Sequence, residues 1–490
     1  MNTYNLGKNR MLCWDDFLIE KKENAEVRMH HPKRKNRILN CDQDWEGNHC
    51  GYARYIKVGD KFRFYYGCKN YVFRPERSDV SCNKRCFAVC ESSDGKTFKR
   101  MPINKYEYDG VTHNNIFLLE DRDNFSIFYD ENPDCPENER FKALGMGGGE
   151  GYPQDNGPRG LYMWVSEDGI DFKMKGLLPL PGSFDSYNSM LWDKETKQYY
   201  FFYRGEHRTD GGEIDFDIVK KERSIFREIR VSTSKDLVNF EHFGELDYGA
   251  DNIPMQFYTN NIVKYYRAND MFIGMPMRYN DRWEDAENYE QMPLPERHAY
   301  MTKAWGREGT ALSDAGLITS RDGYHFNKWD EAFFTQGIEA RNNWWYGGTT
   351  PHYGMWETES DNEAEPNELS FIVHENYRIK AVEFWRYTIR IDGFFSWYAK
   401  FRGGEILTKP FTFEGDELEI NFATSAFGDV TVTVCDEEGN ELEGYKSIKI
   451  FGDTLSRKVK FEKPLSALNG KPIRLKFNLR DCDLYSFKFN

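Results

Sequence analysis

A seven-residue box, Ser-x-Asp-(Gly or Leu)-x-x-Phe, occurs four times and limits the fold more than any other feature of the chain. The copies begin at Ser92, Ser166, Ser234 and Ser320, so 68 to 86 residues separate successive starts. Each copy follows a short apolar run that is typical of a strand. Asp and Gly favour a tight turn between two strands, and the Phe re-enters the hydrophobic layer between sheets. A repeat of this length indicates one large propeller blade per copy.

Strand-like alternation extends beyond the boxes and predicts five units, the fifth without a box. The units begin near Cys41, Tyr106, Pro181, Asp251 and Ala332. From Gly403 onward, short alternating strands between turns indicate a β-sandwich. We therefore expect an all-β chain with two domains. Residues 1–402 form a five-bladed β-propeller, in which residues 1–40 are a lead-in that adds a strand to the last blade. Residues 403–490 form a small C-terminal β-sandwich, which is an accessory domain.

Composition excludes several classes of function. The net charge is −14 and the basic residues form no stripe, which argues against nucleic-acid binding. No apolar run approaches the roughly 20 residues that span a bilayer, and the N-terminus lacks a hydrophobic signal core. We therefore expect no membrane partner and a cytoplasmic location. No cofactor is expected, although a structural cation in the propeller channel and a homo-oligomer both stay open.

In a propeller, the innermost strand of each blade lines the central channel, so polar side chains converge where that strand begins. Three acids in such segments are the catalytic candidates: Glu46, Asp185 and Glu339. Glycoside hydrolysis needs two carboxyl groups beside the scissile bond. We assign proton donation to Asp185 or Glu339, and the role of base or nucleophile to Glu46. The alternative for each is a solvated or turn-capping acid, and Asp44 and Asp314 are reserves.

Substrate-binding candidates come from the same channel-facing segments and from two strand ends. Amides and acids bind sugar hydroxyls, and aromatic faces stack on sugar rings. A metal at His113 is not expected, because no second ligand stands at a familiar spacing. The predicted binding residues are Asp44, Trp45, His113, Asn115, Asn188, Arg204, Gln256, Tyr258, Arg278 and Trp345.

Several motifs together resemble bacterial five-bladed propeller proteins related to glycoside hydrolase families 32 and 43. The resemblance covers nearly the whole chain and implies a sugar-active propeller. Families 32 and 43 place Asp, Asp and Glu in blades one, two and three, whereas this chain has His113-Asn114-Asn115 in unit two and Asp185 in unit three. The motifs are Asp44-Trp45-Glu46-Gly47, the boxes, Phe184-Asp185-Ser186 with Trp192-Asp193, Gly274–Tyr279, Arg390–Phe394, Gly403-Gly404-Glu405 with Thr408-Lys409-Pro410, and Asp481–Tyr485.

Three functions follow from these observations. The first is a glycoside hydrolase, exo-acting on a plant or microbial oligosaccharide. The second is a glycoside phosphorylase, which needs cations at the channel mouth to hold phosphate; the candidates are Arg204, Arg278, Arg341 and His113. The third is a non-catalytic carbohydrate-binding propeller. The sugar, the linkage, the stereochemical course and the role of the sandwich are not determined by the sequence.

Overall fold

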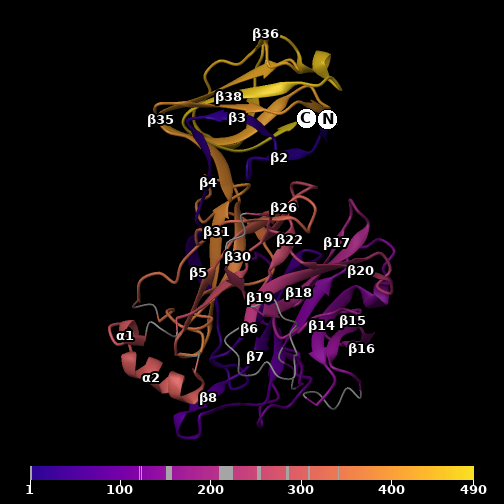
Figure 1. The fold of residues 1–490 in the computed structure, drawn as a ribbon. Coiled ribbons are helices and arrows are strands. Elements are labelled where there is room, and N and C mark those ends of the chain that lie inside the picture. Colours follow the sequence, from indigo (N-terminus) through magenta and orange to yellow (C-terminus); the bar gives the residue numbers. More distant parts are fainter. Residues whose placement is uncertain are drawn as a thin grey trace.

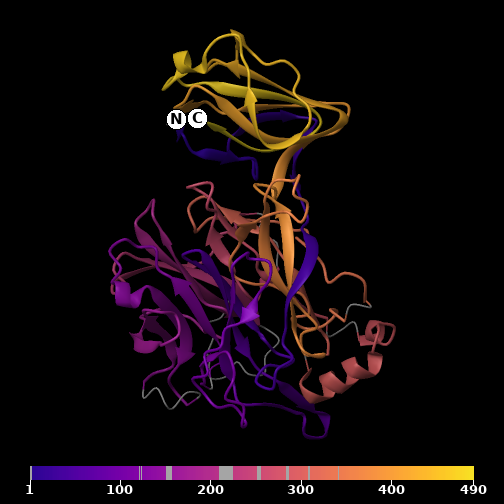
Figure 2. The same cartoon turned by 180° about the vertical axis from the view of Figure 1, so that it is seen from behind.

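The computed structural model describes residues 3–120, 122, 124–150, 157–208, 225–250, 255–282, 286–306, 309–339 and 342–490 (Figure 1). Strands dominate these residues, which confirms the all-β prediction. They form two bodies, a larger lower one and an upper one that carries both chain termini (Figures 1 and 2). No helix in the described part of the chain is long and apolar enough to cross a bilayer.

The four Ser-x-Asp boxes fold into the same turn. In the first copy, Asp94 Oδ1 accepts hydrogen bonds from the backbone N–H groups of Lys96 and Thr97, both at 2.8 Å, and Ser92 Oγ accepts one from Gly95 at 2.9 Å. The same three bonds recur in the other copies. The residue after the Asp has a positive φ each time, which favours glycine. The turn interpretation of the box is confirmed.

The first three units each form an antiparallel sheet, which has five strands in the first and four in the second and third. The first sheet contains β6 (Gly51–Val58), β7 (Lys61–Cys68), β10 (Cys86–Ser92) and β11 (Lys99–Arg100), with β12 (Ile116–Leu118) also on β10. The second contains β13 (Phe125–Tyr129), β14 (Phe141–Gly147), β15 (Gly160–Ser166) and β16 (Lys173–Leu177). The third contains β17 (Ser189–Asp193), β18 (Gln198–Arg208), β19 (Ile225–Ser234) and β20 (Phe240–Glu245).

The fourth unit divides into two sheets with two helices between its strands. One sheet holds β22 (Ile262–Lys264), β23 (Phe272–Gly274), β26 (Ile318–Ser320) and β27 (Phe326–Lys328), and the other β21 (Gln256–Phe257), β24 (Met277–Asp281) and β25 (Ala311–Ala315). The helices are α1 (Ala286–Tyr289) and α2 (Pro295–Ala304). Pro at the first position, an acid in the first turn and a Lys in the last turn favour α2. Its inner face packs on the β8–β9 hairpin (Tyr71–Arg74, Asp79–Cys82).

The fifth sheet takes its last strand from the N-terminal segment. It contains β28 (Thr350–Pro351), β30 (Glu368–Glu375), β31 (Glu383–Arg390) and β5 (Lys33–Asn40), with β29 (Trp356–Thr358) also on β30. Thus the predicted lead-in does add a strand to the last unit. The edge strands of the sheets contact one another in turn: β6 with β13, β13 with β17, β17 with β22, and β25 with β28. A backbone bridge between Arg54 and Tyr353 joins the first sheet to the fifth.

The upper body is one large sheet that draws strands from both ends of the chain. Its C-terminal strands are β32 (Phe395–Ala399), β33 (Gly404–Thr408), β35 (Leu418–Cys435), β36 (Glu441–Lys446), β37 (Asp453–Val459) and β38 (Arg474–Phe489). Its N-terminal strands are β2 (Arg10–Leu12), β3 (Ile19–Glu23) and β4 (Ala25–Met29), while β1 (Tyr4–Gly7) pairs with β34 (Phe411–Phe413). Residues before position 30 therefore share a sheet with residues beyond 403, and the chain division at residue 403 stays a prediction.

Candidate active site

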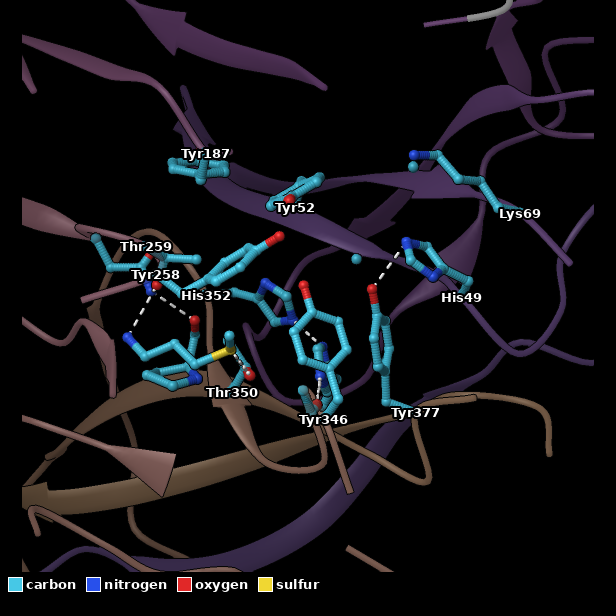
Figure 3. A pocket seen from close by; sticks show the side chains of 17 residues that line it. His49, Tyr52, Lys69, Tyr187, Tyr258, Thr259, Tyr346, Thr350, His352 and Tyr377 are labelled. Carbon is cyan, nitrogen blue, oxygen red and sulfur yellow. Dashed lines mark hydrogen bonds between the residues drawn. The ribbon is translucent and has the colours of Figure 1, made fainter. Parts of the chain in front are cut away.

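A narrow central cavity of about 40 Å³ lies where the edge strands of the sheets meet (Figure 3). This is room for only a few water molecules. Its lining includes five tyrosines, three histidines and Lys69, with no carboxylate among the described lining residues. Tyr52, Tyr187 and Lys69 lie across the cavity from Tyr346 and Tyr377 (Figure 3).

One side of the cavity is a hydrogen-bonded relay through His49. Burial, together with the charges of Arg378 and Lys69, holds the pKa of His49 well below its ordinary value, so the ring is neutral. Arg378 Nε donates to His49 Nδ1 at 2.9 Å, which places the ring proton on Nε2. That proton is donated to Tyr377 Oη at 2.8 Å. The hydroxyl proton of Tyr377 is therefore available to the cavity.

A second relay fixes two further histidines. The backbone N–H of Ala53 donates to His352 Nδ1 at 3.2 Å, so neutral His352 carries its proton on Nε2 and donates to His374 Nδ1 at 2.9 Å. His374 Nε2 in turn donates to the carbonyl oxygen of Gly347 at 2.5 Å. Burial lowers the pKa of His374 to about 4 and holds that of His352 well below its ordinary value. Both rings are therefore uncharged near neutral pH, and the ring proton of each is held in a hydrogen bond.

A much larger cleft of about 1470 Å³ opens beside the fourth sheet, between β24, β25 and α1. Three residues that the sequence analysis predicted as site residues line this cleft together: Gln256, Arg278 and Glu339. The reserve acid Asp314 lines it too. Glu287 of α1 adds another exposed carboxyl group to the lining. Aromatic rings of Tyr279 and Trp344 line the same cleft. This mixture of acids, amides and rings matches the hydroxyl and C–H faces of a sugar.

Hydrogen bonds hold the polar groups of the cleft in place. Arg278 donates through Nε and Nη2 to both oxygens of Asp314, each at 2.6 Å, which is the bidentate geometry of a strong pair. Gln256 Oε1 accepts from the backbone N–H and the guanidinium of Arg227, at 3.2 and 3.0 Å. Because Asp314 is occupied by Arg278, the carboxyl groups of Glu287 and Glu339 are better placed to act on a substrate.

Glu46 and Asp44 line a separate pocket of about 550 Å³. The Glu46 side chain is buried and accepts hydrogen bonds from Tyr66 at 2.6 Å and from Arg100 at 3.0 and 2.7 Å. Burial raises the pKa of Glu46, and Arg100 acts in the opposite direction. Asp44 is exposed at the rim. No described pocket contains two of the three predicted catalytic acids.

The remaining predicted residues lie at several different places. Asp185 and His113 are exposed, and neither lines the cavity or the cleft. Tyr258 lines the central cavity, and buried Arg204 donates to its carbonyl oxygen at 2.6 Å. Arg341 lies outside the described residues.

Four predicted binding residues are buried and take part in packing or backbone bonding. Trp45 donates to Asn115 Oδ1 at 2.9 Å. Asn115 in turn donates to Tyr66 at 3.0 Å, which links both residues to the Glu46 pocket. Asn188 donates to two carbonyl oxygens of its own loop. Trp345 stacks on His298 of α2, with ring centroids 3.7 Å apart.

The sequence interpretation missed the residues of the two histidine relays. His49 stands inside a segment that was predicted to face the channel, as does Tyr187 of the cavity lining, but acids and amides beside them were chosen instead. His352, His374 and Tyr377 belong to the fifth unit, where no box marks the register. No group of three or more His, Cys, Asp or Glu residues in the described ranges could hold a metal ion.

No protein-family model and no curated protein matches the chain. Several solved structures that are similar to it at low identity are named as glycoside hydrolases, and one is named as an N-acetylgalactosamine deacetylase. A family 32 β-fructofuranosidase from Bombyx mori is 10% identical over 94% of each chain, with a TM-score of 0.38. A glycoside hydrolase of the GH130 family of mannoside phosphorylases, which targets β-1,2-mannosidic linkages in Candida mannan, is 13% identical over 77% of this chain and 96% of its own, with a TM-score of 0.42. These similarities assign no site residue to the chain.

Proposed function

We propose that the chain is a five-bladed propeller with a C-terminal β-sandwich, and that it is a glycoside hydrolase acting on an oligosaccharide in the cleft. Five successive units support the propeller, because each contributes edge strands of its antiparallel sheets to the series of contacts, the fourth unit through β22 and β25 of its two sheets. The bridge between Arg54 and Tyr353 supports closure of that ring.

The observation that carries the proposed activity is the composition and size of the cleft. Its volume of about 1470 Å³ exceeds the roughly 300–1000 Å³ of most small-ligand pockets, so a chain of several sugars fits. The central cavity, at about 40 Å³, is too small for a sugar ring. We therefore place the substrate in the cleft, stacked on Tyr279 or Trp344.

Glu339 and Glu287 are the proposed catalytic pair. Hydrolysis needs one carboxyl group that protonates the leaving oxygen and another that acts as base or nucleophile. Both acids are exposed in the cleft, and they come from different segments, so they can approach a bound glycoside from two sides. Glu46 is not part of this pair, because Arg100 and Tyr66 hold it in another pocket.

Replacing Glu339 and Glu287 singly by Gln tests the activity on a panel of oligosaccharides. We expect each change to lower kcat by about 100-fold or more, because general acid–base groups contribute roughly 10²–10⁴. Glu438→Gln, in an exposed turn of the upper body, is the matched control and keeps the wild-type rate. Wild-type rates for both cleft variants would contradict the proposal.

A glycoside phosphorylase is the second candidate, because Arg278 and Arg282 also line the cleft and guanidinium groups bind phosphate. The two activities differ in one requirement. If product forms only when inorganic phosphate is added and is a sugar phosphate, the chain is a phosphorylase. Turnover in phosphate-free buffer supports the hydrolase.

A further inference from the structure

Three cysteines stand side by side across the first sheet. Gly51 of β6 lies opposite Gly67 of the antiparallel strand β7. One position further, this register places Cys50 opposite Cys68. On the other side of β7, Cys68 lies opposite Cys86 of β10. All three are free thiols, each is at most 1% exposed, and they belong to one buried cluster. We call them the cysteine row.

The pairing of the strands brings Cys50 closest to Cys68. The backbone N–H of His49 donates to the carbonyl oxygen of Lys69 at 3.1 Å, which makes these two residues a hydrogen-bonded pair. The next pair, Cys50 and Cys68, is therefore non-hydrogen-bonded, with Cα atoms about 4.5 Å apart and side chains close together. This separation lies within the roughly 4.4–6.8 Å that disulfides span. Cys68 turns its backbone groups toward Cys86, and a hydrogen-bonded pair of that kind is wider, at about 5.5 Å.

The thiol of Cys50 is the reactive member of the cysteine row. Burial raises its pKa, but hydrogen bonds from the thiols of Cys41 and Cys68 and from two backbone groups outweigh burial and hold the pKa well below its ordinary value. The pKa of Cys68 is raised well above its ordinary value, first by burial and then by its hydrogen bond to Cys50. A thiolate thus lies beside a thiol, and the thiolate is the nucleophile in thiol oxidation.

A small oxidant can reach Cys50 from the pocket that Glu46 lines. Cys41 and Gly47 line the same pocket, whose volume is about 550 Å³. Both also contact Cys50, Cys41 through its thiol and Gly47 through its backbone. The Cys50 sulfur therefore lies directly behind the wall of the pocket, within reach of an oxidant that is little larger than water.

We propose that Cys50 and Cys68 form a reversible disulfide when hydrogen peroxide enters this pocket. The Cys50 sulfur attacks one oxygen of the peroxide, the O–O bond breaks, and a sulfenic acid and hydroxide form. The hydroxide takes the proton of the Cys68 thiol. The Cys68 sulfur then bonds to the Cys50 sulfur, and the S–O bond breaks with release of hydroxide. One thiolate, one thiol and one peroxide thus yield one disulfide, one water and one hydroxide.

The crosslink joins the residue before β6 to the last residue of β7. Their neighbours His49 and Lys69 line the central cavity, so oxidation fixes that wall of the cavity in place. This inference concerns the first sheet rather than the cleft, and it does not depend on the proposed hydrolase activity.

Peptide mapping without reduction tests the proposal on the full-length protein. The native protein is treated with hydrogen peroxide at neutral pH, free thiols are blocked with iodoacetamide, and the digest is analysed by mass spectrometry. The expected product is a crosslinked peptide pair that contains Cys50 and Cys68 and separates with dithiothreitol. It should form about 10-fold or more faster than buried Cys435 is oxidised, because burial raises the pKa of Cys435 and even an ordinary thiol is only a few per cent thiolate at neutral pH.

Variants assign the roles of the thiols. Cys50→Ser removes the thiolate and should abolish the disulfide. Cys41→Ser should still form it, because Cys68 is the partner. Adding Cys68→Ser to Cys41→Ser removes the resolving thiol, so the sulfenic acid of Cys50 persists and reacts with dimedone. Cys90→Ser is the matched control: Cys90 is equally buried in the same cluster, but its thiol donates to Tyr66 Oη, and the variant should form the disulfide as the wild type does.

The proposal is overturned if the peroxide-treated wild type contains no crosslink between Cys50 and Cys68, or if a crosslink to Cys41 or Cys86 is the main product. It is also overturned if the crosslink forms only when the protein unfolds, which circular dichroism of the same samples detects. These outcomes are read from the wild type alone, so they hold even if a variant does not fold.

Discussion

At the scale of single residues, the environment of a carboxyl group determines what it can do. Glu46 and Glu339 both stand in segments that the sequence places at the start of an inner strand. Glu46 is bound by an arginine and a tyrosine, whereas Glu339 is exposed in the cleft. A carboxylate that already accepts three hydrogen bonds from other side chains has little capacity left for a substrate proton.

We predict that Glu46→Gln lowers stability and leaves turnover unchanged. The amide keeps the shape but loses the charge that Arg100 binds, at a cost of about 2 kcal/mol since hydrogen bonds to charged groups contribute 1.5–3 kcal/mol. Urea unfolding measures the change. Glu91→Gln is the control, because its partner Lys61 is 61% exposed and the pair should contribute under about 1 kcal/mol. Lost turnover with unchanged stability would instead make Glu46 catalytic.

Glu228 of β19 should make stability depend on pH. Burial raises its pKa to about 7, although Lys328 lies 3.5 Å away and opposes the shift. Since the folded pKa exceeds the unfolded value, the folded state binds more protons between them, and stability falls as pH rises from about 4.5 to 7. The loss is about 3 kcal/mol, from 1.36 kcal/mol per pKa unit.

The measurement is the free energy of unfolding at pH 5, 6.5 and 8. Glu228→Gln cannot titrate, so the part of the pH slope that comes from this group should disappear. The charges of His207 and Glu245 act on Glu228 and are present in both proteins, so the comparison is of pH slopes between the variant and the wild type. Identical slopes would show that Glu228 ionises normally.

At the scale of elements, the sequence predicts best what is decided locally. The box turn rests on bonds between residues two and three positions apart, so its sequence is sufficient to predict it. The contacts of individual site residues cannot be predicted in this way, because their partners are distant in the sequence. Arg100 reaches Glu46 across 54 positions, and nothing near Glu46 indicates that partner. Likewise, α2 packs on the distant β8–β9 hairpin, and its own pattern is too polar to predict a helix.

The box turn also permits a test of close packing. Gly95 has φ of +68°, and a Cβ there would lie 2.6 Å from Trp356 Nε1, whereas Gly59 has φ of +60° with nothing within 4 Å. Both Gly→Ala changes incur the backbone strain of about 1–2 kcal/mol. Only Gly95→Ala adds a clash, so we expect it to destabilise by at least about 1 kcal/mol more in urea unfolding. Equal losses would show that Trp356 moves aside.

At the scale of the whole molecule, the two bodies are joined by strands and by a buried ionic centre. Asp392 is fully buried and accepts hydrogen bonds from Tyr265 at 2.8 Å, in the lower body, and from Ser486 of β38 at 2.7 Å, in the upper one. Arg10 and Arg267 lie 3.6 and 3.4 Å from its carboxylate. Because β2 to β4 belong to the upper sheet while β5 pairs with β31 in the lower body, and β32 to β38 return to the upper sheet, the bodies are also linked twice through the chain.

We predict that Asp392→Asn separates the unfolding of the two bodies. The variant leaves buried Arg10 and partly buried Arg267 near a neutral group, and breaking a buried ion pair costs about 3–5 kcal/mol. The loss falls on the junction, so calorimetry should show two transitions where the wild type shows one. Asp453→Asn is the matched control: Asp453 pairs with Arg390 between the same bodies but is 66% exposed, so its loss should cost under about 1 kcal/mol. A single transition in Asp392→Asn, shifted no further than in the control, would mean that the strands alone couple the bodies.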